Sequence, residues 1–194
     1  MSWSIIHQPE KPIIPVEEFE TYLRYTAEDD QERAHMVQCL LAAENYVGCY
    51  HGMPIQCCTI KWSFPLKRDK FACIPISSIV EENGRAKLPV PMANKVLSSR
   101  LFINEQWVDM EEGFCKLAPE REHVVLDRTK IPKNSPASIP IVELKIEAGY
   151  SKRNLPKIIK ITLLQVAAAY FDGRTDRIRA YLTQIEAYRP KKIV

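Results

Sequence analysis

The chain has 194 residues, of which 46% are hydrophobic and 26% charged, and this composition predicts an ordinary globular protein with a buried core in one domain. It has only six glycines and no GxGxxG, Walker, HExxH or GxSxG motif, which argues against a phosphate-cradling loop and the common catalytic sites. The net charge of +3 is uneven: residues 1–50 carry 3 basic and 9 acidic side chains, residues 51–150 carry 14 and 12, and residues 151–194 carry 10 and 3. An acidic and a basic end suit head-to-tail contacts between copies, and two separately solvated faces explain the gradient equally well.

The first fifty residues predict two helices. The segment MSWSIIHQPEKP has no basic stretch followed by an apolar one, so we expect no secretory signal. The sequence VEEFETYLRY then has apolar residues at helical spacing, which predicts a short helix from Val16. The acidic cluster at 28–30 opens a longer helix, whose apolar stripe runs from Met36 to Tyr50 and ends before Gly52 and Pro54.

The middle of the chain, from about 55 to 147, is rich in strand-forming residues. We expect strands at 56–64, 71–79, 101–103, 107–108 and 124–126, with a hairpin turn at 104–106. Prolines 75, 89, 91, 119, 132, 136 and 140 divide the region into short pieces and favour edge strands or loops. This part of the chain should therefore form a small β region between two helical parts.

The strongest pattern lies between residues 141 and 174. Val142, Leu144 and Ile146 alternate with charged residues, as in a strand with one buried face. A polar loop follows, and Pro156 suits the start of a helix. Residues 157–171 are apolar around most of the helix circumference, which predicts the central helix of the fold. The apolar run covers about fourteen residues and a membrane span needs roughly twenty, so we expect no span here.

Few residues suggest chemistry. The six cysteines lack CxxC spacing and the four histidines are scattered, so we expect reduced, packed thiols and no metal site. Adjacent Cys57 and Cys58 should point to opposite faces of a strand. Lys152 and Arg153 precede a helix start, where an anion can bind, and a solvated loop is the alternative.

The order of these elements resembles the C-terminal half of phage head–tail connector (adaptor) proteins, which also occur in gene transfer agents. The resemblance rests on a strand ending Ala148-Gly149-Tyr150, a loop ending Leu155-Pro156, and an apolar helix leading into Tyr170-Phe171-Asp172-Gly173-Arg174. The N-terminal half agrees, because those proteins also begin with a short helix, an acidic turn and a long helix that ends at glycine. Leu88-Pro89-Val90-Pro91 matches an LP-x-P element of their β region.

The elements and the resemblance together predict an α+β fold that is mainly an α-helical bundle, with two N-terminal and two C-terminal helices and an inserted small antiparallel β subdomain. They predict a single connector domain over residues 1–194. Its helical parts would be 16–51 and 156–189, its β-rich insert about 55–147, and its C-terminal tail 190–194. A final helix would present Ile178, Tyr181, Leu182, Ile185 and Tyr188 on one side.

The resemblance implies a structural subunit that is not an enzyme and has no catalytic, cofactor-binding or metal-binding residues. Such a subunit is made in the bacterial cytoplasm and ends in the virion, at the neck of a phage or phage-like particle. There it would form a homo-oligomeric ring, expected to be dodecameric, beneath the portal protein. The ring would continue the DNA channel, touch passing DNA without sequence specificity, and offer its far face to the next neck, stopper or tail protein, with no role for a membrane.

The resemblance also implies candidate contact residues. In that family the C-terminal helix and tail reach toward the portal, which gives the docking candidates Arg189, Lys191, Lys192, Ile193 and Val194. A frayed terminus is the alternative. The loop residues Lys152 and Arg153 would face the lumen or an anion.

A rival function is a small nucleic-acid-binding or regulatory domain that acts as a monomer or dimer. It is suggested by the basic side chains in the last 44 residues, although no recognition-helix motif or aromatic stacking platform accompanies them. An enzyme with an unrecognised site is a third possibility.

Overall fold

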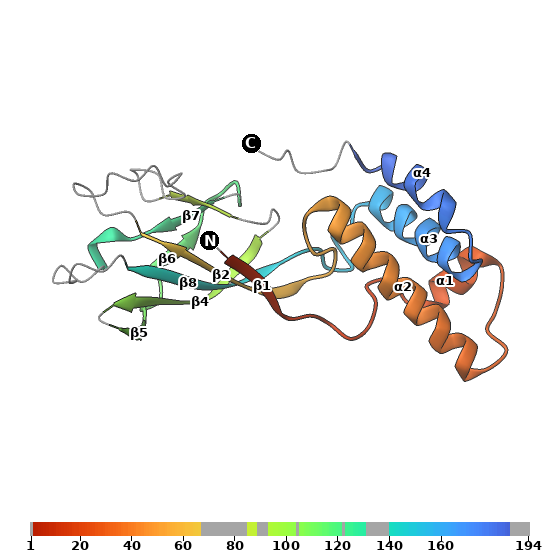
Figure 1. Cartoon of the computed structure of the whole chain (residues 1–194), viewed down its shortest axis with the longest axis horizontal. Coiled ribbons are helices and arrows are strands. Elements are labelled where there is room, and N and C mark those ends of the chain that lie inside the picture. Colours follow the sequence, from red (N-terminus) through yellow and green to blue (C-terminus); the bar gives the residue numbers. More distant parts are fainter. Residues whose placement is uncertain are drawn as a thin grey trace. The chain divides into compact units, whose positions relative to one another are not determined.

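The computed structural model describes residues 2–66, 85–88, 93–103, 105–121, 123–130 and 140–186. The chain divides into two compact units (Figure 1). We call Met1–His7 with Cys58–Ala148 the β unit, and Gln8–Cys57 with Gly149–Val194 the helical unit. The backbone therefore passes between the units three times, after His7, Cys57 and Ala148.

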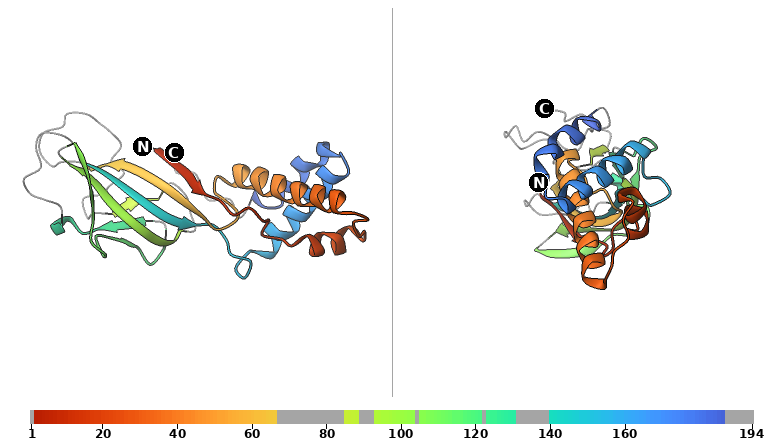
Figure 2. Two further views of the ribbon diagram at one scale, coloured as in Figure 1. Left: turned by 90° about the horizontal axis from the view of Figure 1, so that it is seen from below. Right: turned by 90° about the vertical axis from the view of Figure 1, so that its right-hand side faces the viewer.

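The helical unit contains α1 (Val16–Leu23), α2 (Asp30–His51), α3 (Lys157–Phe171) and α4 (Ile178–Thr183), with a 3-10 turn at Thr175–Arg177. Helix α3 packs against both α2 and α4, and the two views in Figure 2 show α2 and α3 side by side. Contact with neighbours on several sides explains why α3 is apolar around most of its surface. Leu163, Val166 and Ala167 are fully buried, as the sequence predicted for the central helix.

The ends of α2 have clear local causes. The side chain of Asp29 accepts a hydrogen bond from the Glu32 backbone N–H at 2.8 Å, which satisfies one of the unpaired amides of the first turn. At the other end Gly52 adopts φ 77°, and its N–H donates to the carbonyl of Gly48 at 2.9 Å. Both caps lie where the acidic cluster and the glycine predicted the helix to start and stop.

The described part of the β unit contains two antiparallel sheets. The larger has the strand order β1 (Ser2–His7), β2 (Cys58–Pro65), β8 (Ile141–Ala148), β4 (Ala93–Ile103) and β5 (Gln106–Asp109). The smaller has the order β3 (Arg85–Lys87), β7 (His123–Leu126) and β6 (Cys115–Leu117). A short 3-10 turn at Arg128–Lys130 follows β7.

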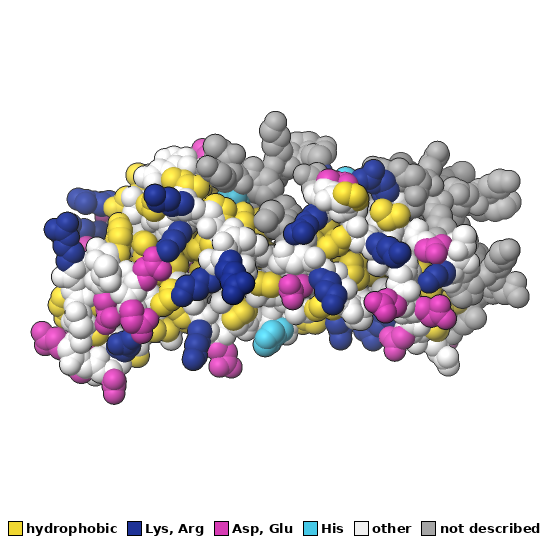
Figure 3. All heavy atoms as spheres, turned by 180° about the vertical axis from the view of Figure 1, so that it is seen from behind, with side chains coloured by type: hydrophobic (Ala, Val, Ile, Leu, Met, Phe, Trp, Pro, Cys, Tyr) yellow, Lys and Arg dark blue, Asp and Glu magenta, His cyan; other side chains and the backbone are white. Residues whose placement is uncertain are grey.

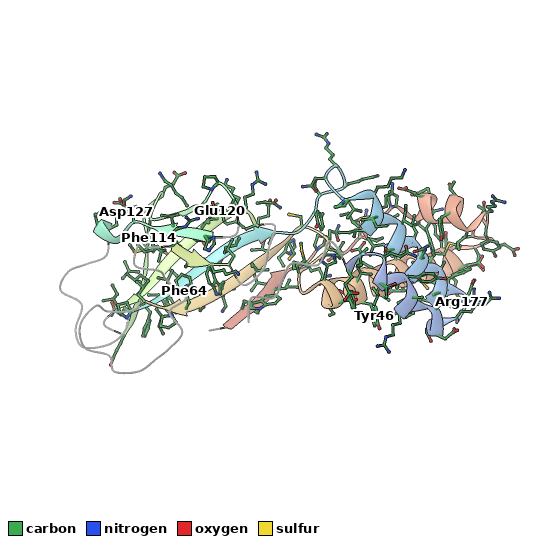
Figure 4. The ribbon with its side chains drawn as sticks, turned by 90° about the horizontal axis from the view of Figure 1, so that it is seen from above. Tyr46, Phe64, Phe114, Glu120, Asp127 and Arg177 are labelled. Atoms are coloured by element: carbon green, nitrogen blue, oxygen red, sulfur yellow. The ribbon has the colours of Figure 1, made fainter. Side chains whose placement is uncertain are left out.

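One hydrophobic core joins these two sheets. On β2, every second side chain is buried, and Ile60, Trp62 and Phe64 lie opposite Ile146, Leu144 and Val142 of β8. The smaller sheet contributes Ala86, Cys115, Val124 and Leu126, and Phe114, the residue before β6, also belongs to this core. Figure 4 labels Phe64 and Phe114, which are among the largest fully buried side chains.

Strand β8 is the central strand of the larger sheet, and its predicted alternation is confirmed. Val142, Leu144 and Ile146 are fully buried on the core face. Glu143, on the other face, is buried too, because β2 and β4 flank it. Its carboxylate accepts a hydrogen bond from the Arg100 guanidinium at 2.7 Å and lies 3.8 Å from the Lys61 ammonium, so the buried charge is paired.

The prediction of a mainly helical bundle with a small β insert is wrong. Of the described residues, 38% are helical and 32% are in strands, and the eight strands form two sheets with their own core. The described part does contain four helices, two from each end of the chain. The sequence underestimated the β region because its strands pair over long sequence separations, for example Cys58 with Ala148.

Some of the strand predictions are confirmed, and other strands were not predicted. The strand at 56–64 matches β2, residues 124–126 lie in β7, and the hairpin joins β4 to β5. The sequence missed β1, β3, β6 and the first part of β4. The predicted strand at 71–79 and the end of the final helix beyond residue 186 lie outside the described residues, as does most of the LP-x-P element.

Candidate functional site

The Ala-Gly-Tyr motif is a backbone junction where β8 ends. Gly149 has φ 108°, and a Cβ at this position would lie 2.5 Å from the carbonyl oxygen of Gln56. Tyr150 then donates its N–H to the Ile55 carbonyl, and the Cys57 N–H donates to the Tyr150 carbonyl, each at 2.8 Å. The glycine is therefore required by the close approach of two backbone segments, and the role of the motif within this chain is structural.

The loop that follows presents the two basic residues that the sequence singled out. Asn154 organises this loop: its side-chain oxygen accepts from the Ser151 N–H at 2.5 Å and from the Ser151 hydroxyl at 2.9 Å. Lys152 and Arg153 are exposed at the tip of this turn. Helix α3 begins immediately afterwards, with Pro156 at its N-cap and no acidic residue in its first turn. This arrangement leaves positive charge accessible to an anion.

The predicted docking residues Arg189, Lys191, Lys192, Ile193 and Val194 lie outside the described residues. The rest of the charge gradient does have a structural explanation. The acidic N-terminal helices and the basic C-terminal segment fold into the same unit, where Glu18 of α1 pairs with Lys160 of α3. On the face seen in Figure 3, basic side chains are interspersed with acidic ones. The gradient along the sequence is therefore partly neutralised inside the helical unit.

A cysteine–histidine pair on α2 resembles a reactive site. The Sγ of Cys39 lies 3.7 Å from Nε2 of His35, one turn earlier on α2. Burial raises the pKa of the Cys39 thiol, whereas a nucleophilic cysteine needs a lowered pKa. The His35 ring also packs on Phe171, with 5.7 Å between ring centroids. The pair thus has the environment of core packing.

Two further features of the described residues bear on function. Within the described ranges, no group of three or more His, Cys, Asp or Glu side chains is placed to hold a metal ion. No helix in the described part is both long enough and apolar enough to span a membrane.

A buried carboxylate fixes the proline-rich segment that leads into α1. Glu44 on α2 is 4% exposed, and its Oε1 accepts a hydrogen bond from the Ile13 backbone N–H at 2.6 Å. Burial raises the pKa of Glu44 from 4.5 to about 7, although the hydrogen bond from Ile13 opposes the shift. The group is therefore close to its titration point at neutral pH.

The most unusual surface is formed by the two outer strands of the larger sheet. Trp3, Ile5 and Ile6 on β1, and Trp107 and Val108 on β5, are between 42% and 47% exposed. The strands predicted from the sequence do not include β1. The alternation of Ser4 with Trp3 and Ile5 is the period-2 signal that identifies the strand.

No protein-family model matches this chain, and no curated protein matches it either. Solved structures do match, and three of them come from gene transfer agent (GTA) particles. The neck of an empty particle, computed with C6 symmetry, contains a chain with a TM-score of 0.74 and 17% identity. The virion of a native particle gives 0.72 and 18%, and the neck of a native particle, computed with C12 symmetry, gives 0.68 and 17%.

In each case the match covers 100% of this chain and 98% of the other chain. The resemblance to neck proteins that the sequence suggested is confirmed in this sense, because the matching chains come from necks and a virion. At 17–18% identity the similarity concerns the fold. The chain shares its complete two-unit fold with chains of gene transfer agent particles.

Proposed function

We propose that this chain is a structural neck protein of a phage or phage-like particle, a head–tail connector whose copies form a ring. The observation that carries the proposal is the end-to-end fold match to chains of gene transfer agent particles. Both units would act together as one connector subunit. Two of these neck structures were computed with C6 or C12 symmetry, and cyclic symmetry is what a ring of identical subunits requires.

The chemistry of the described residues agrees with a passive role. A channel wall must let DNA slide, so it should not hold phosphates through many fixed cations. The cations Arg33, Lys61, Arg100 and Lys160 each pair with a carboxylate of the same chain. Lys152 and Arg153 are exposed and are the candidates for weak, sequence-independent contact with DNA. The same ring would dock on the portal through Arg189, Lys191, Lys192, Ile193 and Val194, and its far face would meet the next neck or tail component.

A size measurement tests the ring and separates it from the rival DNA-binding domain. We expect the purified chain to form closed rings in electron micrographs, at high concentration or on the portal. Binding to any DNA should be weak and should fall steeply with salt. A chain that stays monomeric or dimeric under both conditions, and binds one DNA sequence tightly at physiological salt, would refute the connector role.

The docking tail has its own test. Deletion of residues 190–194 should leave the subunit folded but prevent it from joining portal-bearing particles. Normal yields of complete necks from the truncated chain would show that these residues have no docking role. The double change Lys152→Ala with Arg153→Ala is a matched control, because it also removes two exposed cations but should leave portal docking intact.

A further inference from the structure

The larger sheet of the β unit is open at both ends. Its edge strands are β1 on one side and β5 on the other, and we call these two edges the margins of the sheet. Each edge strand pairs with only one neighbour among the described residues. The outer backbone N–H and C=O groups of such strands are ready to pair with another chain. Proteins that stay monomeric usually protect these edges with charges or proline. Strand β1, SWSIIH, contains neither proline nor any Lys, Arg, Asp or Glu.

At both margins, exposed apolar side chains extend the core face of the sheet. Residues directly opposite each other in a pair of strands share a face. Trp3 and Ile5 lie opposite the buried Trp62 and Ile60, so both extend the core face beyond β2. At the other margin Val108 lies opposite the buried Leu101, and so it also extends the core face.

On the other face of the sheet, a large side chain on β5 would meet a small one on β1. On β5, Trp107 stacks against Phe102 with 5.2 Å between ring centroids, and the Arg100 guanidinium lies 4.4 Å from the centre of its ring. These contacts hold a large side chain at this margin. On β1 the corresponding face carries the small Ser4, opposite Lys61. A strand placed beside β5 would therefore offer space to Trp107 on one face and apolar cover to Val108 on the other.

We propose that β1 of one subunit pairs with β5 of the next, so that the sheet continues from subunit to subunit. This inference rests on the proposed ring, and it names the surface that closes it. The two margins differ, so their pairing is head-to-tail, which is the kind of contact that generates rings. Pairing of β1 with β1 would give a two-fold dimer and leave Val108 and Trp107 bare.

The strand directions add a specific expectation. Each neighbouring pair in the sheet is antiparallel, and four such steps lead from β1 to β5, so β1 and β5 run in the same direction. Rotation about a ring axis preserves the component of a strand along that axis. If the strands run along the ring axis, β5 of one subunit and β1 of its neighbour therefore point the same way and form a parallel pair.

Charge substitution at the two margins tests the junction. Ile5→Glu and Val108→Glu should each raise the concentration needed for ring assembly by about tenfold or more, because each places an unpaired charge in an apolar contact. The double variant Ile5→Lys with Val108→Glu should recover much of the loss, because opposite charges then meet. Leu97→Glu is the matched control: Leu97 is 46% exposed on β4 of the same sheet, and its replacement should leave assembly unchanged.

Ring mass and hydrogen exchange of the full chain provide the readouts, with melts confirming that each variant is folded. On assembly, amides of residues 2–7 and 106–109 should become protected, while those of β7 should not change. Rings that assemble normally with Ile5→Glu or Val108→Glu would overturn the junction but leave the ring proposal standing. If Ile5→Glu abolishes association but Val108→Glu does not, the contact is a β1–β1 pair, and the proposed junction between β1 and β5 is also overturned. A wild-type chain that forms no ring would overturn both proposals.

Discussion

The two units differ in the apolar side chains that they leave exposed. In the described part of the helical unit, the large exposed hydrophobic residues are all tyrosines: Tyr22, Tyr25 and Tyr46. Among the described residues of the β unit they are tryptophan and aliphatic residues: Trp3, Ile5, Ile6, Leu97, Trp107, Val108 and Val125. A tyrosine hydroxyl remains hydrated at a surface, whereas isoleucine and valine gain only when they are covered.

This difference indicates which unit depends on partners. The helical unit covers its own apolar surface, for example where Phe171 packs on Phe19 and Tyr25 at centroid distances of 6.3 and 6.1 Å. The β unit has a complete core between its sheets but continues the apolar face to both margins. Exposed apolar margins of this kind mark sites of association. We therefore expect stability to reside in both units and association mainly in the β unit.

A buried charge placed in one unit at a time tests this difference between the units most directly. Leu163→Asp should destabilise the helical unit by about 4 kcal/mol or more, because Leu163 is fully buried in α3. All three tryptophans, Trp3, Trp62 and Trp107, belong to the β unit, so their fluorescence follows that unit alone. Circular dichroism at 222 nm follows mainly the helices. We expect the helical transition to shift much further than the fluorescence transition.

The mirror variant is Leu144→Asp, at a fully buried position of β8. It should shift the fluorescence transition and leave the helical signal less affected. If both probes shift together in both variants, the units unfold as one cooperative body, and the separation of their roles in stability is wrong.

Gly149→Ala should have the next largest effect, a loss of about 3 kcal/mol in the free energy of unfolding. Two costs combine: an alanine at φ 108° is strained, and its Cβ would lie 2.5 Å from the Gln56 carbonyl oxygen. Gly173→Ala is the matched control, with φ 69° and nothing within 4 Å, and it should cost only about 1 kcal/mol. Urea titrations give both values. Equal losses would mean that the close approach to Gln56 contributes nothing.

The pH dependence of unfolding should also differ between the units. The Glu44 carboxyl is protonated in both folded and unfolded chains below its unfolded pKa of 4.5, and the folded chain must bury a carboxylate once the pH exceeds about 7. Glu44 therefore lowers stability progressively as the pH rises from 4.5 to about 7, by about 3 kcal/mol in total. Glu44→Gln should be more stable than the wild type at pH 8, with a smaller difference at pH 5.

Only the helical transition should show this change, because Glu44 lies on α2. Glu10→Gln replaces an exposed carboxylate near the same segment and should have no comparable effect at either pH. A wild-type-like pH dependence in Glu44→Gln would show that another group is responsible.

The smallest effect on stability is expected for the exposed residues themselves. Ile6→Thr and Tyr22→Thr should each change the free energy of unfolding by less than about 0.5 kcal/mol. Their effects on self-association should differ, because Ile6 lies on the margin strand β1 and Tyr22 on α1. Sedimentation velocity should show weaker association for Ile6→Thr only. Equal weakening by both changes would remove the distinction between the two surfaces.

The sequence predicted the helical elements well and the β unit poorly, for a physical reason. Signals at Asp29, Gly52 and Pro156 act within one turn of their own helix, so they can be read locally. In contrast, whether a strand is central or at an edge depends on distant partners. The alternation in the sequence predicts that Glu143 faces solvent, but β2 and β4 bury it on both sides.

The functional surfaces show the same limit. The Ala-Gly-Tyr motif could be recognised in the sequence, whereas its cause, contact with Gln56, lies more than ninety positions away. The margin at Val108 could not be predicted, because its exposure follows from the position of β5 in the strand order.

The three passages of the backbone between the units also determine when each unit can fold during synthesis. Helix α2 ends at His51, but its packing partner α3 ends only at Phe171. At about 5 to 20 residues per second, the ribosome needs on the order of 6 to 24 s for that interval. During most of this interval α3 has not yet been made, so the apolar stripe of α2 is uncovered. The last strand of the β unit, β8, is made before α3. The nascent chain would therefore complete the β unit before the helical unit, although α1 and α2 are made earlier than seven of the eight strands.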